Sequence, residues 1–423
     1  MQLSESDPPQ RERHEHHDQD RQHSPVRLQY LGVKRQHPDA LLFFRMGDFY
    51  ELFDEDAEVA ARELELTLTR RDWGRGEKTP MAGVPHHAAD GYIARLIGKG
   101  FRVAVCEQTS DPALSKGLVE REVLRVVTPG TVVDPAMLAA KRNNYLAAAV
   151  LGRDAVGLAY ADITTGEFCC AQMSAADPEA ALIQELARVQ PAELLIEAAP
   201  AQRESFAPWR EAASPSGPLA LRGEGEPDSP SPRKGLGDEA TPRLGDDSTR
   251  VTSYDARAFR EDVARTRLLE QFQVATLEAY GCEGLPLAIR AAGAVIAYLR
   301  ETQKGALAQF TALETYSTTG FMTLDAHTRR NLELFESGRG GNVKGSLLWV
   351  LDATRTPMGG RLLRRWLAEP LLDLERLRAR QDAVAAALAD SLLRARLAPA
   401  LAKVGDLERL TSRILSRIAT PRD

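Results

Sequence analysis

The strongest constraint on the fold of this chain is a change of hydrophobic pattern near residue 255. Before it, short apolar runs of strand length alternate with segments whose apolar residues recur at helical spacing. After it, the strand-like runs disappear and helical spacing continues. At 423 residues the chain is too long for one ordinary core. The pattern therefore predicts a multidomain protein, with α/β domains first and an all-α region after them.

The first α/β domain is organised around residues 41–64. An apolar run of strand length is broken by Gly47. We predict that Asp48 then caps a helix, because its carboxylate can accept backbone N–H groups while Glu51 reaches back in a capping box. Helical spacing explains the apolar residues that follow, but it leaves Phe49 on the first turn with no place in the core. Phe49 is therefore a candidate contact residue.

The rest of this domain, which we expect to span residues 24–135, adds helices and strands around that segment. Ser24 and Pro25 are typical of a helix start. The pattern predicts a mixed sheet. The remaining expected elements are a helix over 87–99 and strands over 65–73, 101–108 and 120–127.

A second α/β domain is expected over residues 143–270. Residues 144–172 are typical of a strand and a hairpin, 178–189 of a helix and 192–197 of a further strand. Residues 212–250 are rich in Pro, Gly, Ser, Asp and Glu, which predicts a disordered insertion. The polar tail at 1–23 is expected to be disordered as well.

The helical region is expected over residues 271–423, and a long helix predicted at 256–280 leads into it. Its elements are predicted at 286–303, 325–334, 374–388 and 392–418, and we expect the last two to coil against each other.

Composition narrows the classes of function. The formal net charge is −6, yet residues 323–423 hold 18 Lys and Arg against 12 Asp and Glu, whereas residues 26–131 hold 15 against 16. A duplex bound by the basic helices is plausible. No apolar run approaches the roughly 18 residues of a membrane helix. The four cysteines have no C-x-x-C spacing, so neither a zinc site nor a disulfide framework is expected, and a reducing cytoplasm fits best.

Four ordered motifs carry a resemblance to a known family. They are RMGDFYELFDEDA from Arg45, TPMAGVPHHA from Thr79, VAVCEQTSDP from Val103 and VTPGT from Val127. Together they resemble the mismatch-binding domain of the MutS family of bacterial DNA mismatch repair proteins. The resemblance implies a mismatch-binding domain, a connector whose fold is similar to RNase H, and partial core and lever helices.

The resemblance also implies a site. In that family a Phe-x-Glu pair is inserted at the mispaired base, and Phe49 and Glu51 occupy its place. Phe49 would be the wedge that kinks the duplex, and Glu51 would form a hydrogen bond to the mispaired base. Second-rank contact candidates flank these two positions in the motifs: Arg45, Met46, Asp48, Tyr50 and Met81. We predict no catalytic residue and no metal ligand.

The implied partners are mismatched double-stranded DNA, a second copy of the complete protein and a MutL-type repair protein, in a cytoplasmic, nucleoid-associated setting. ATP and Mg²⁺ are implied for the complete family protein through a P-loop ATPase domain. The nearest resemblance to a P-loop, at residues 338–346, has the wrong Gly and Lys order. The chain is therefore expected to be the front portion of a longer protein, with no cofactor and no catalysis of its own.

Two alternatives stay open. A metal-dependent nuclease acting on structured DNA would use the acids of the second domain, Asp162, Glu167 and Glu193. An inactive fragment that only packs against a partner would show no DNA preference. The arginines at 329–330, 361 and 364–365 could bind phosphate, form a solvated face, or form salt bridges to the remainder of the protein beyond this chain.

Overall fold

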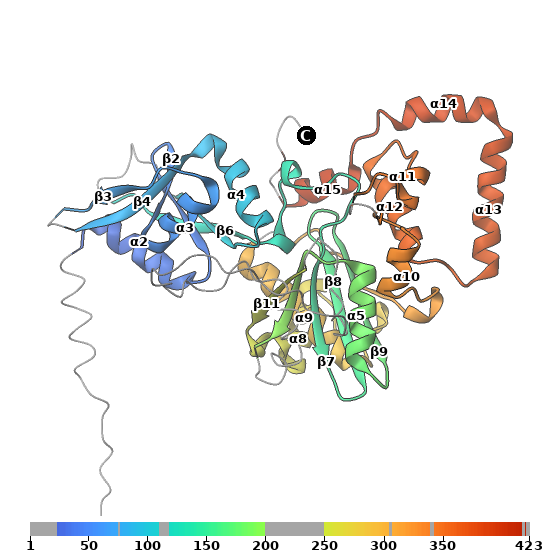
Figure 1. Cartoon of the computed structure of the whole chain (residues 1–423). Helices are drawn as coiled ribbons and strands as arrows, with labels where there is room; N and C mark the ends of the chain where they lie inside the picture. The colour runs from blue at the N-terminus through green and yellow to red at the C-terminus, as the bar shows by residue number, and fades with distance from the viewer. Residues whose placement is uncertain are drawn as a thin grey trace, which may run out of the picture. The chain divides into compact units, whose positions relative to one another are not determined.

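A computed structural model of the chain describes residues 23–74, 77–109, 118–198, 249–303, 307–338, 342–416 and 419. The chain divides into two compact units, Met1–Thr128 and Pro129–Asp423, and each is described by itself (Figure 1). The predicted tail and insertion lie outside the described residues, except for His23, Thr249 and Arg250.

The first unit is built on a six-stranded sheet with strand order β3-β4-β2-β1-β5-β6. Strands β1 and β5 pair in parallel, and the other four neighbouring pairs are antiparallel, so the mixed sheet predicted from the sequence is confirmed. The strands are β1 (Leu41–Met46), β2 (Phe49–Phe53), β3 (Thr69–Asp72), β4 (Lys78–Pro85), β5 (Val103–Gln108) and β6 (Arg121–Val127).

Helices lie on both faces of this sheet. Helix α2 (Pro25–Gln36) is capped by Ser24, as predicted, and its Tyr30 packs on the face that carries Phe44 and Phe53. Phe43 and Leu52 alternate to the opposite face, which α3 (Asp54–Leu64) and α4 (Ala89–Gly98) cover. A 3-10 turn, η1 (His86–Ala88), precedes α4.

The predicted helix start at Asp48 is wrong. Residues 49–53 form strand β2, which pairs antiparallel with β1 through a two-residue turn at Gly47 and Asp48. Gly47 has a φ of +58°, the left-handed conformation that so tight a hairpin requires at its first turn position. Helix α3 begins only at Asp54, so Glu51 takes no part in a capping box.

The second unit contains its own six-stranded sheet, in the order β11-β10-β7-β8-β9-β12. The predicted hairpins are confirmed: β7, β8 and β9 pair antiparallel in succession, and the other neighbouring pairs are parallel. The strands are β7 (Leu146–Leu151), β8 (Ala155–Asp162), β9 (Glu167–Ser174), β10 (Glu193–Glu197), β11 (Arg250–Tyr254) and β12 (Glu314–Thr315). Strand β12 follows residue 255, where no strand was expected, because two residues give no readable alternation.

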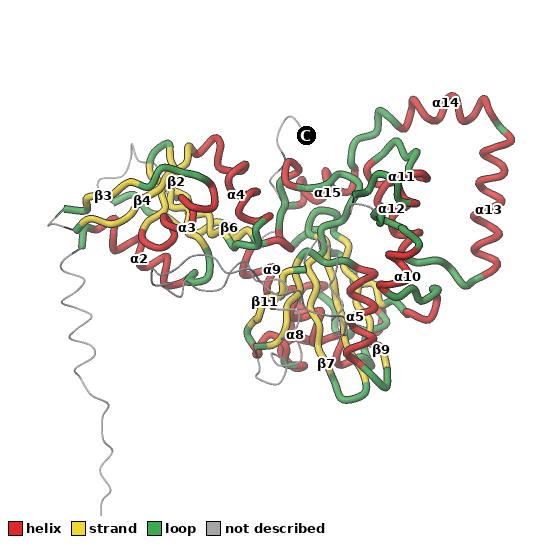
Figure 2. Tube along the Cα trace, in the orientation of Figure 1, coloured by secondary structure: helices red, strands yellow, loops and turns green. Residues whose placement is uncertain are grey.

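Three helices enclose this second sheet (Figure 2). Helix α5 (Pro178–Val189) packs on one face through Leu182, Leu186 and Val189. Helix α9 (Pro286–Thr302) packs on the other face, with α8 (Glu261–Phe272) against it. Twelve of the 17 residues of α9 are buried, which identifies it as an internal layer.

Two glycines make this layering possible. A Cβ atom on Gly157 of β8 would lie 2.2 Å from the carbonyl carbon of Leu287, and one on Gly293 of α9 would lie 2.3 Å from Cβ of Ala264. Real side chains do not approach so closely. The sheet, α9 and α8 therefore meet at backbone distance at these two points.

A small apolar cluster of Leu324, Leu334, Phe335, Leu348 and Ala368 lies among the first of the remaining helices. They are α10 (Ala326–Asn331), α11 (Leu347–Leu351), α12 (Pro357–Ala368), α13 (Leu374–Ala389), α14 (Ser391–Leu401) and α15 (Leu407–Leu415). The 3-10 turns of the unit are η2 (Pro129–Thr131), η3 (Pro135–Met137), η4 (Ala256–Phe259), η5 (Glu278–Tyr280) and η6 (Thr318–Gly320). Among the described residues, no helix is long and apolar enough to cross a membrane.

Two helix predictions in this region are wrong. The helix expected over 256–280 is divided into η4, α8 and η5, because Arg260 is extended and Gln273 adopts the left-handed conformation. The expected coil between the last two helices is absent from the described residues: α13 and α14 follow one another around a bend at Asp390 (Figure 1). Asp390 ends α13 and caps α14 by accepting a hydrogen bond from Leu393 N.

Candidate nucleic-acid interface

The candidate contact residue Phe49 lies at the first position of β2, directly after the hairpin turn. Its side chain is 47% exposed, whereas the neighbouring Phe43, Phe44 and Phe53 are all 0% exposed. Since side chains alternate along a strand, Phe49, Glu51 and Phe53 point to one face of the sheet. Tyr30 of α2 covers Phe53, with ring centroids 4.9 Å apart, and leaves the Phe49 end of the strand uncovered.

Register extends this surface onto the neighbouring strand. Glu51 pairs with Gly83 of β4. A Cβ atom built on Gly83 would lie 3.8 Å from Cγ of Glu51 and 3.9 Å from Cδ1 of Phe49, which is ordinary van der Waals contact. At Gly83, the surface beside both residues therefore consists of backbone without a side chain. We call the surface made by Phe49, Glu51, Gly83 and Arg71 the Phe49 face.

Glu51 is held in place by an ion pair. Nη1 of Arg71, from β3, lies 3.1 Å from Oε2 of Glu51. The Glu51 side chain is 14% exposed and that of Arg71 is 38% exposed. Burial raises the pKa of the Glu51 carboxyl above its ordinary value, and the positive charge of Arg71 opposes that rise. Glu51 is thus a partly buried carboxylate with one counter-charge.

Two of the second-rank candidates lie on the same face of the sheet as Phe49. Met46 pairs with Phe49 across the hairpin, and Met81 pairs with Phe53 across β2 and β4. Both methionines pack at the edge of the core cluster under α2. Asp48 is exposed in the turn, and its carbonyl oxygen accepts a hydrogen bond from His86 N at 2.9 Å.

The other two candidates point to the opposite face. Tyr50 is buried against Phe43, and its hydroxyl donates a hydrogen bond to Glu107. Burial raises the pKa of the Tyr50 hydroxyl well above its ordinary value. The guanidinium of Arg45 lies 5.5 Å from the Tyr50 ring centroid. The structure thus divides the predicted site residues between two faces and a turn.

The sequence also holds a signal for this hairpin that the helix-capping interpretation missed. A Gly-Asp pair between two runs rich in β-branched or aromatic residues is typical of a two-residue hairpin. Asp54, rather than Asp48, opens α3, and its carboxylate receives two hydrogen bonds from Arg27 at 2.8 and 2.9 Å. Arg71 and Gly83 were not predicted, because only the strand register brings them beside Glu51.

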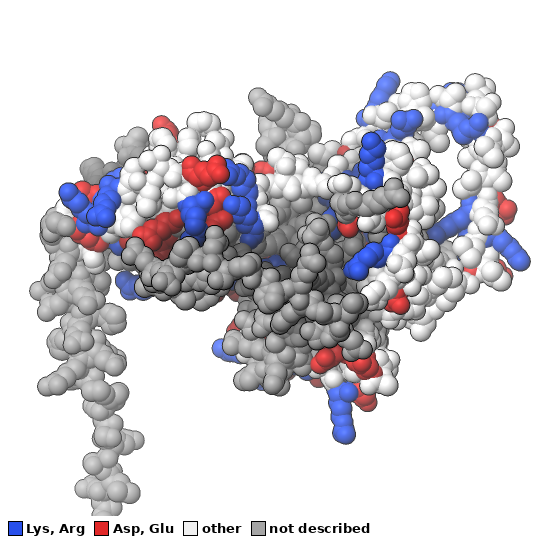
Figure 3. All heavy atoms as spheres, viewed as in Figure 1, with Lys and Arg blue, Asp and Glu red and all other residues white. Residues whose placement is uncertain are grey.

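The charges of the first unit are mixed. On the visible face of this unit, acidic and basic side chains alternate (Figure 3). Several of the acids are neutralised locally, as Arg27 does for Asp54 and Lys34 for Asp56, at 2.8 and 2.9 Å. Long-range attraction of the visible surface to a polyanion is therefore modest.

The acids that a nuclease would use in the second unit are occupied by hydrogen bonds. Asp162 accepts hydrogen bonds from Asn143, from the backbone of Asn144 and from Thr164, at 2.6 to 3.1 Å. Glu193 accepts from Tyr298 at 2.7 Å. Glu167 pairs with Arg365 at 2.6 Å. Within the described ranges, no group of three His, Cys, Asp or Glu residues could hold a metal ion, so the nuclease alternative has no support.

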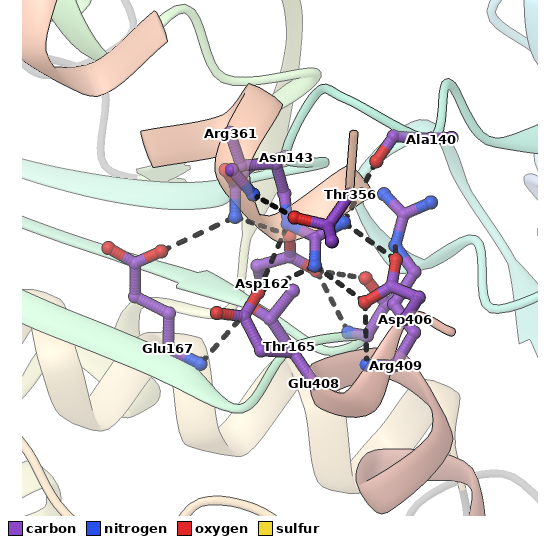
Figure 4. A network of polar contacts seen from close by, with 12 residues as sticks. Ala140, Asn143, Asp162, Thr165, Glu167, Thr356, Arg361, Asp406, Glu408 and Arg409 are labelled. Carbon is purple, nitrogen blue, oxygen red and sulfur yellow. Dashed lines mark hydrogen bonds and ion pairs between the residues drawn. The ribbon is translucent and has the colours of Figure 1, made fainter. Parts of the chain in front are cut away.

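A polar network lies near the N-terminal end of α12 (Figure 4). Arg361 contacts Asp406 and Glu408 at 2.7 and 2.6 Å and donates to the carbonyl oxygen of Ala140 at 2.8 Å. Arg409 donates to the carbonyl oxygens of Ala139 and Arg142. These arginines therefore tie the segment before β7 to α12 and α15. Arg361 and Arg365 thus pair with acids inside the chain, which the sequence did not predict.

The segment that most resembles a P-loop has a different role. In its described part, Ser346 caps α11 by accepting a hydrogen bond from Trp349 N, and its hydroxyl donates to Val343 O. Helix α11 has only five residues. The segment lies between α10 and α11 in the chain.

The architecture defines a modular α/β and α protein with an exposed aromatic residue beside a paired carboxylate. Comparison with known proteins identifies the family. Models described as MutS domain I, MutS domain II and MutS domain III match residues 24–136, 144–311 and 327–423. The chain belongs to the MutS family of DNA mismatch repair proteins.

Individual relatives agree with these matches. The chain is 45% identical over 400 residues to the DNA mismatch repair protein MutS of Dehalococcoides mccartyi, covering 95% of this chain and 42% of the relative. It is 45% identical to the protein of that name from Symbiobacterium thermophilum, with the same coverage, and 46% identical to that from Thermosynechococcus vestitus, covering 95% and 43%. The chain thus spans less than half the length of these relatives.

Proposed function

We propose that the first unit recognises mispaired or unpaired bases in duplex DNA through the Phe49 face. The observation that carries this proposal is the exposure of Phe49, at 47%, on a strand whose other aromatic residues are buried. Pairing with β1 and β4 holds the backbone of Phe49 in a strand, so little backbone entropy would be lost when the ring contacts a base. Membership of a DNA mismatch repair family supports the same role.

The proposed mechanism uses deformability rather than base identity. Inserting an apolar side chain between base pairs costs a few kcal/mol of unstacking, and the cost is smaller where pairing is already weak. Stacking of an aromatic ring on a base returns about 1 to 3 kcal/mol and tolerates any base. Phe49 would therefore insert preferentially at a mispair, where the DNA bends most easily.

Glu51 would supply the polar part of the contact. It lies two residues from Phe49 on the same side of β2, so a base stacked on Phe49 would come within its reach. An ionised carboxylate accepts a hydrogen bond from a base N–H, and a protonated one can donate. DNA phosphates would raise the pKa of Glu51, and the positive charge of Arg71 would oppose that rise.

The wider functions are proposals from family membership. We propose that the sheet of the second unit with α5, α8 and α9 is an RNase H-like connector, and that α10 to α15 belong to the core and lever helices. For a complete protein of this family, we further propose a homodimer that uses ATP and Mg²⁺ and a MutL-type partner, in a cytoplasmic, nucleoid-associated setting. Arginines on α13 and α14 give that region a basic surface, in agreement with DNA contact (Figure 3).

The test is fluorescence anisotropy of the full chain at fixed salt, with a duplex carrying a G·T or an unpaired T and with its matched counterpart. We expect tighter binding to the mispaired duplex. Phe49→Ala should reduce this preference about tenfold, because it removes roughly 1 to 3 kcal/mol of stacking.

Leu68→Ala is the matched control, because Leu68 is a similarly exposed apolar residue of the same unit, at 48%. It should leave the preference unchanged. Equal binding of both duplexes by the unmodified chain, or equal effects of the two substitutions, would contradict the proposal.

A further inference from the structure

We propose that Arg71 is a positioning residue of the Phe49 face: it neutralises Glu51 and holds its carboxylate beside Phe49, where a displaced base can reach it. The inference rests on the proposed function and adds a residue that sets how well Glu51 can act. Its basis is the geometry of three adjacent strands.

Arg71 reaches Glu51 across an intervening strand. Arg71 on β3 pairs with Thr79 of β4, and β4 in turn pairs Gly83 with Glu51 of β2. Met81 lies between these two register positions on the same face of β4, and Gly83 contributes no side chain beside Glu51. Nη1 of Arg71 then lies 3.1 and 3.4 Å from the two carboxylate oxygens.

The Arg71 side chain is itself oriented by the core. Its guanidinium carbon lies 5.6 Å from the centroid of the Trp73 ring, a cation–π distance. Trp73 is buried, and its indole N–H donates to the Thr79 hydroxyl at 2.9 Å. A fixed aromatic ring therefore supports the arginine, which reduces the entropy lost in holding the ion pair.

The chemistry requires such a counter-charge. A lone carboxylate on a surface that approaches DNA is repelled by the phosphates, and the Arg71 charge cancels that repulsion. Two nearby acids have partners of their own: Asp72 lies 3.9 Å from Lys78, and Asp54 pairs with Arg27. Arg71 is the cation that contacts Glu51 in the described structure.

Arg70 provides a matched control. It is the adjacent residue on β3, carries the same charge, is exposed, and points to the opposite face of the sheet because side chains alternate. Loss of Arg70 removes one positive charge from the unit without touching Glu51. The two arginines thus separate a general attraction to phosphate from a specific effect on Glu51.

The first experiment measures the affinity of the full chain for matched and mispaired duplexes at fixed salt. We expect Arg70→Ala to weaken both affinities by about twofold to threefold, as loss of one remote charge would. Arg71→Ala should weaken binding to the mispaired duplex by about tenfold, because it leaves Glu51 uncompensated. In a Glu51→Gln background, Arg71→Ala should weaken binding to the mispaired duplex no more than Arg70→Ala does.

Two results would overturn the proposal. One is an equal effect of Arg70→Ala and Arg71→Ala, and the other is an Arg71→Ala effect that persists undiminished in the Glu51→Gln background. Either would make Arg71 a general phosphate contact.

A second experiment needs no DNA. Glutamate-selective ¹³C labelling of the full chain follows the titration of Glu51, and we expect Arg71→Ala to raise its pKa while Arg70→Ala leaves it in place. An unchanged titration in Arg71→Ala would overturn the ion pair and leave the proposed function standing. Absence of any mismatch preference in the unmodified chain would instead overturn the proposed function itself, and this inference with it.

Discussion

The central strands β8 and β2 of the two sheets differ in how far they are buried. Every residue of β8 is buried, because α5 covers one face and α9 the other. On β2, by contrast, burial changes along the strand from the buried Phe53 to the exposed Phe49. The same architecture, a six-stranded sheet with helices on both faces, gives an inert core in one unit and an uncovered aromatic residue in the other. The difference is the length of sheet that the covering helix reaches.

The largest expected effect tests the buried end of β2. Phe53→Ala should lower the free energy of unfolding of the first unit by about 4 kcal/mol, because it leaves a cavity between Tyr30 and Trp73. Phe49→Ala on the same strand should change it by less than about 0.5 kcal/mol. Urea denaturation with amide hydrogen exchange of β1 and β2 measures both. Similar losses for the two variants would contradict the division of this strand.

The next effect tests the close packing of α9 on the sheet of the second unit. Gly157→Ala should destabilise the second unit by about 3 kcal/mol, because the added methyl group would overlap the backbone of Leu287. Gly284→Ala is the control in the same unit, since nothing lies within 4 Å of its added Cβ atom. Denaturant unfolding compares the two. If Gly157→Ala unfolds at the same denaturant concentration as Gly284→Ala, α9 does not lie at backbone distance from β8.

A smaller effect concerns acid stability. Burial opposes ionisation of Asp406, but the hydrogen bonds and charge of Arg361 outweigh it and lower the pKa of this carboxyl. A depressed native pKa stabilises the fold above the unfolded-state pKa of about 3.9, and this stability is lost as the pH falls through the native pKa. Asp406→Asn should therefore lower the free energy of unfolding by about 1 kcal/mol at neutral pH and by less below about pH 4.

Thermal unfolding of the unmodified chain and of Asp406→Asn, followed across that pH range, measures this effect. A constant difference between the two proteins at every pH would contradict the assignment, because a neutral side chain cannot reproduce the titration of a carboxylate.

The smallest expected effect on stability lies on the Phe49 face. Gly83→Ala should change the free energy of unfolding by less than about 0.5 kcal/mol, since the new methyl group makes ordinary contacts. Gly83→Leu should fold as well but place a side chain between Phe49 and Glu51, and mismatch preference should fall. Retention of the full preference in Gly83→Leu would show that the base does not approach over β4.

Local patterns predicted four strands of each sheet and missed β2, β4, β11 and β12. Ser24 as a helix cap, the run at β1, the hairpins of the second unit and α5 follow from periodicity and turn residues. The error at Asp48 arose because Asp can cap a helix or occupy a tight turn, and pairing with β1 decides between the two. Exposed leucines on α13 and α14 repeat at helical spacing, yet spacing cannot reveal the bend at Asp390.

The site was harder to predict than the framework. Motif resemblance selected Phe49 and Glu51 and added Arg45 and Tyr50 because they are adjacent in sequence. Strand alternation separates these pairs onto opposite faces. Arg71 lies 20 residues from Glu51 in the chain, and only the register of three strands brings it near.

The most direct test of the central claim places 2-aminopurine next to a mispair and follows its fluorescence on binding. If Phe49 inserts at the mispair, the unmodified chain should change the emission of this base but not that of a probe several base pairs away. Phe49→Ala should lose the change while Leu68→Ala keeps it. An equal change with Phe49→Ala would mean that Phe49 does not enter the duplex, and would contradict the account.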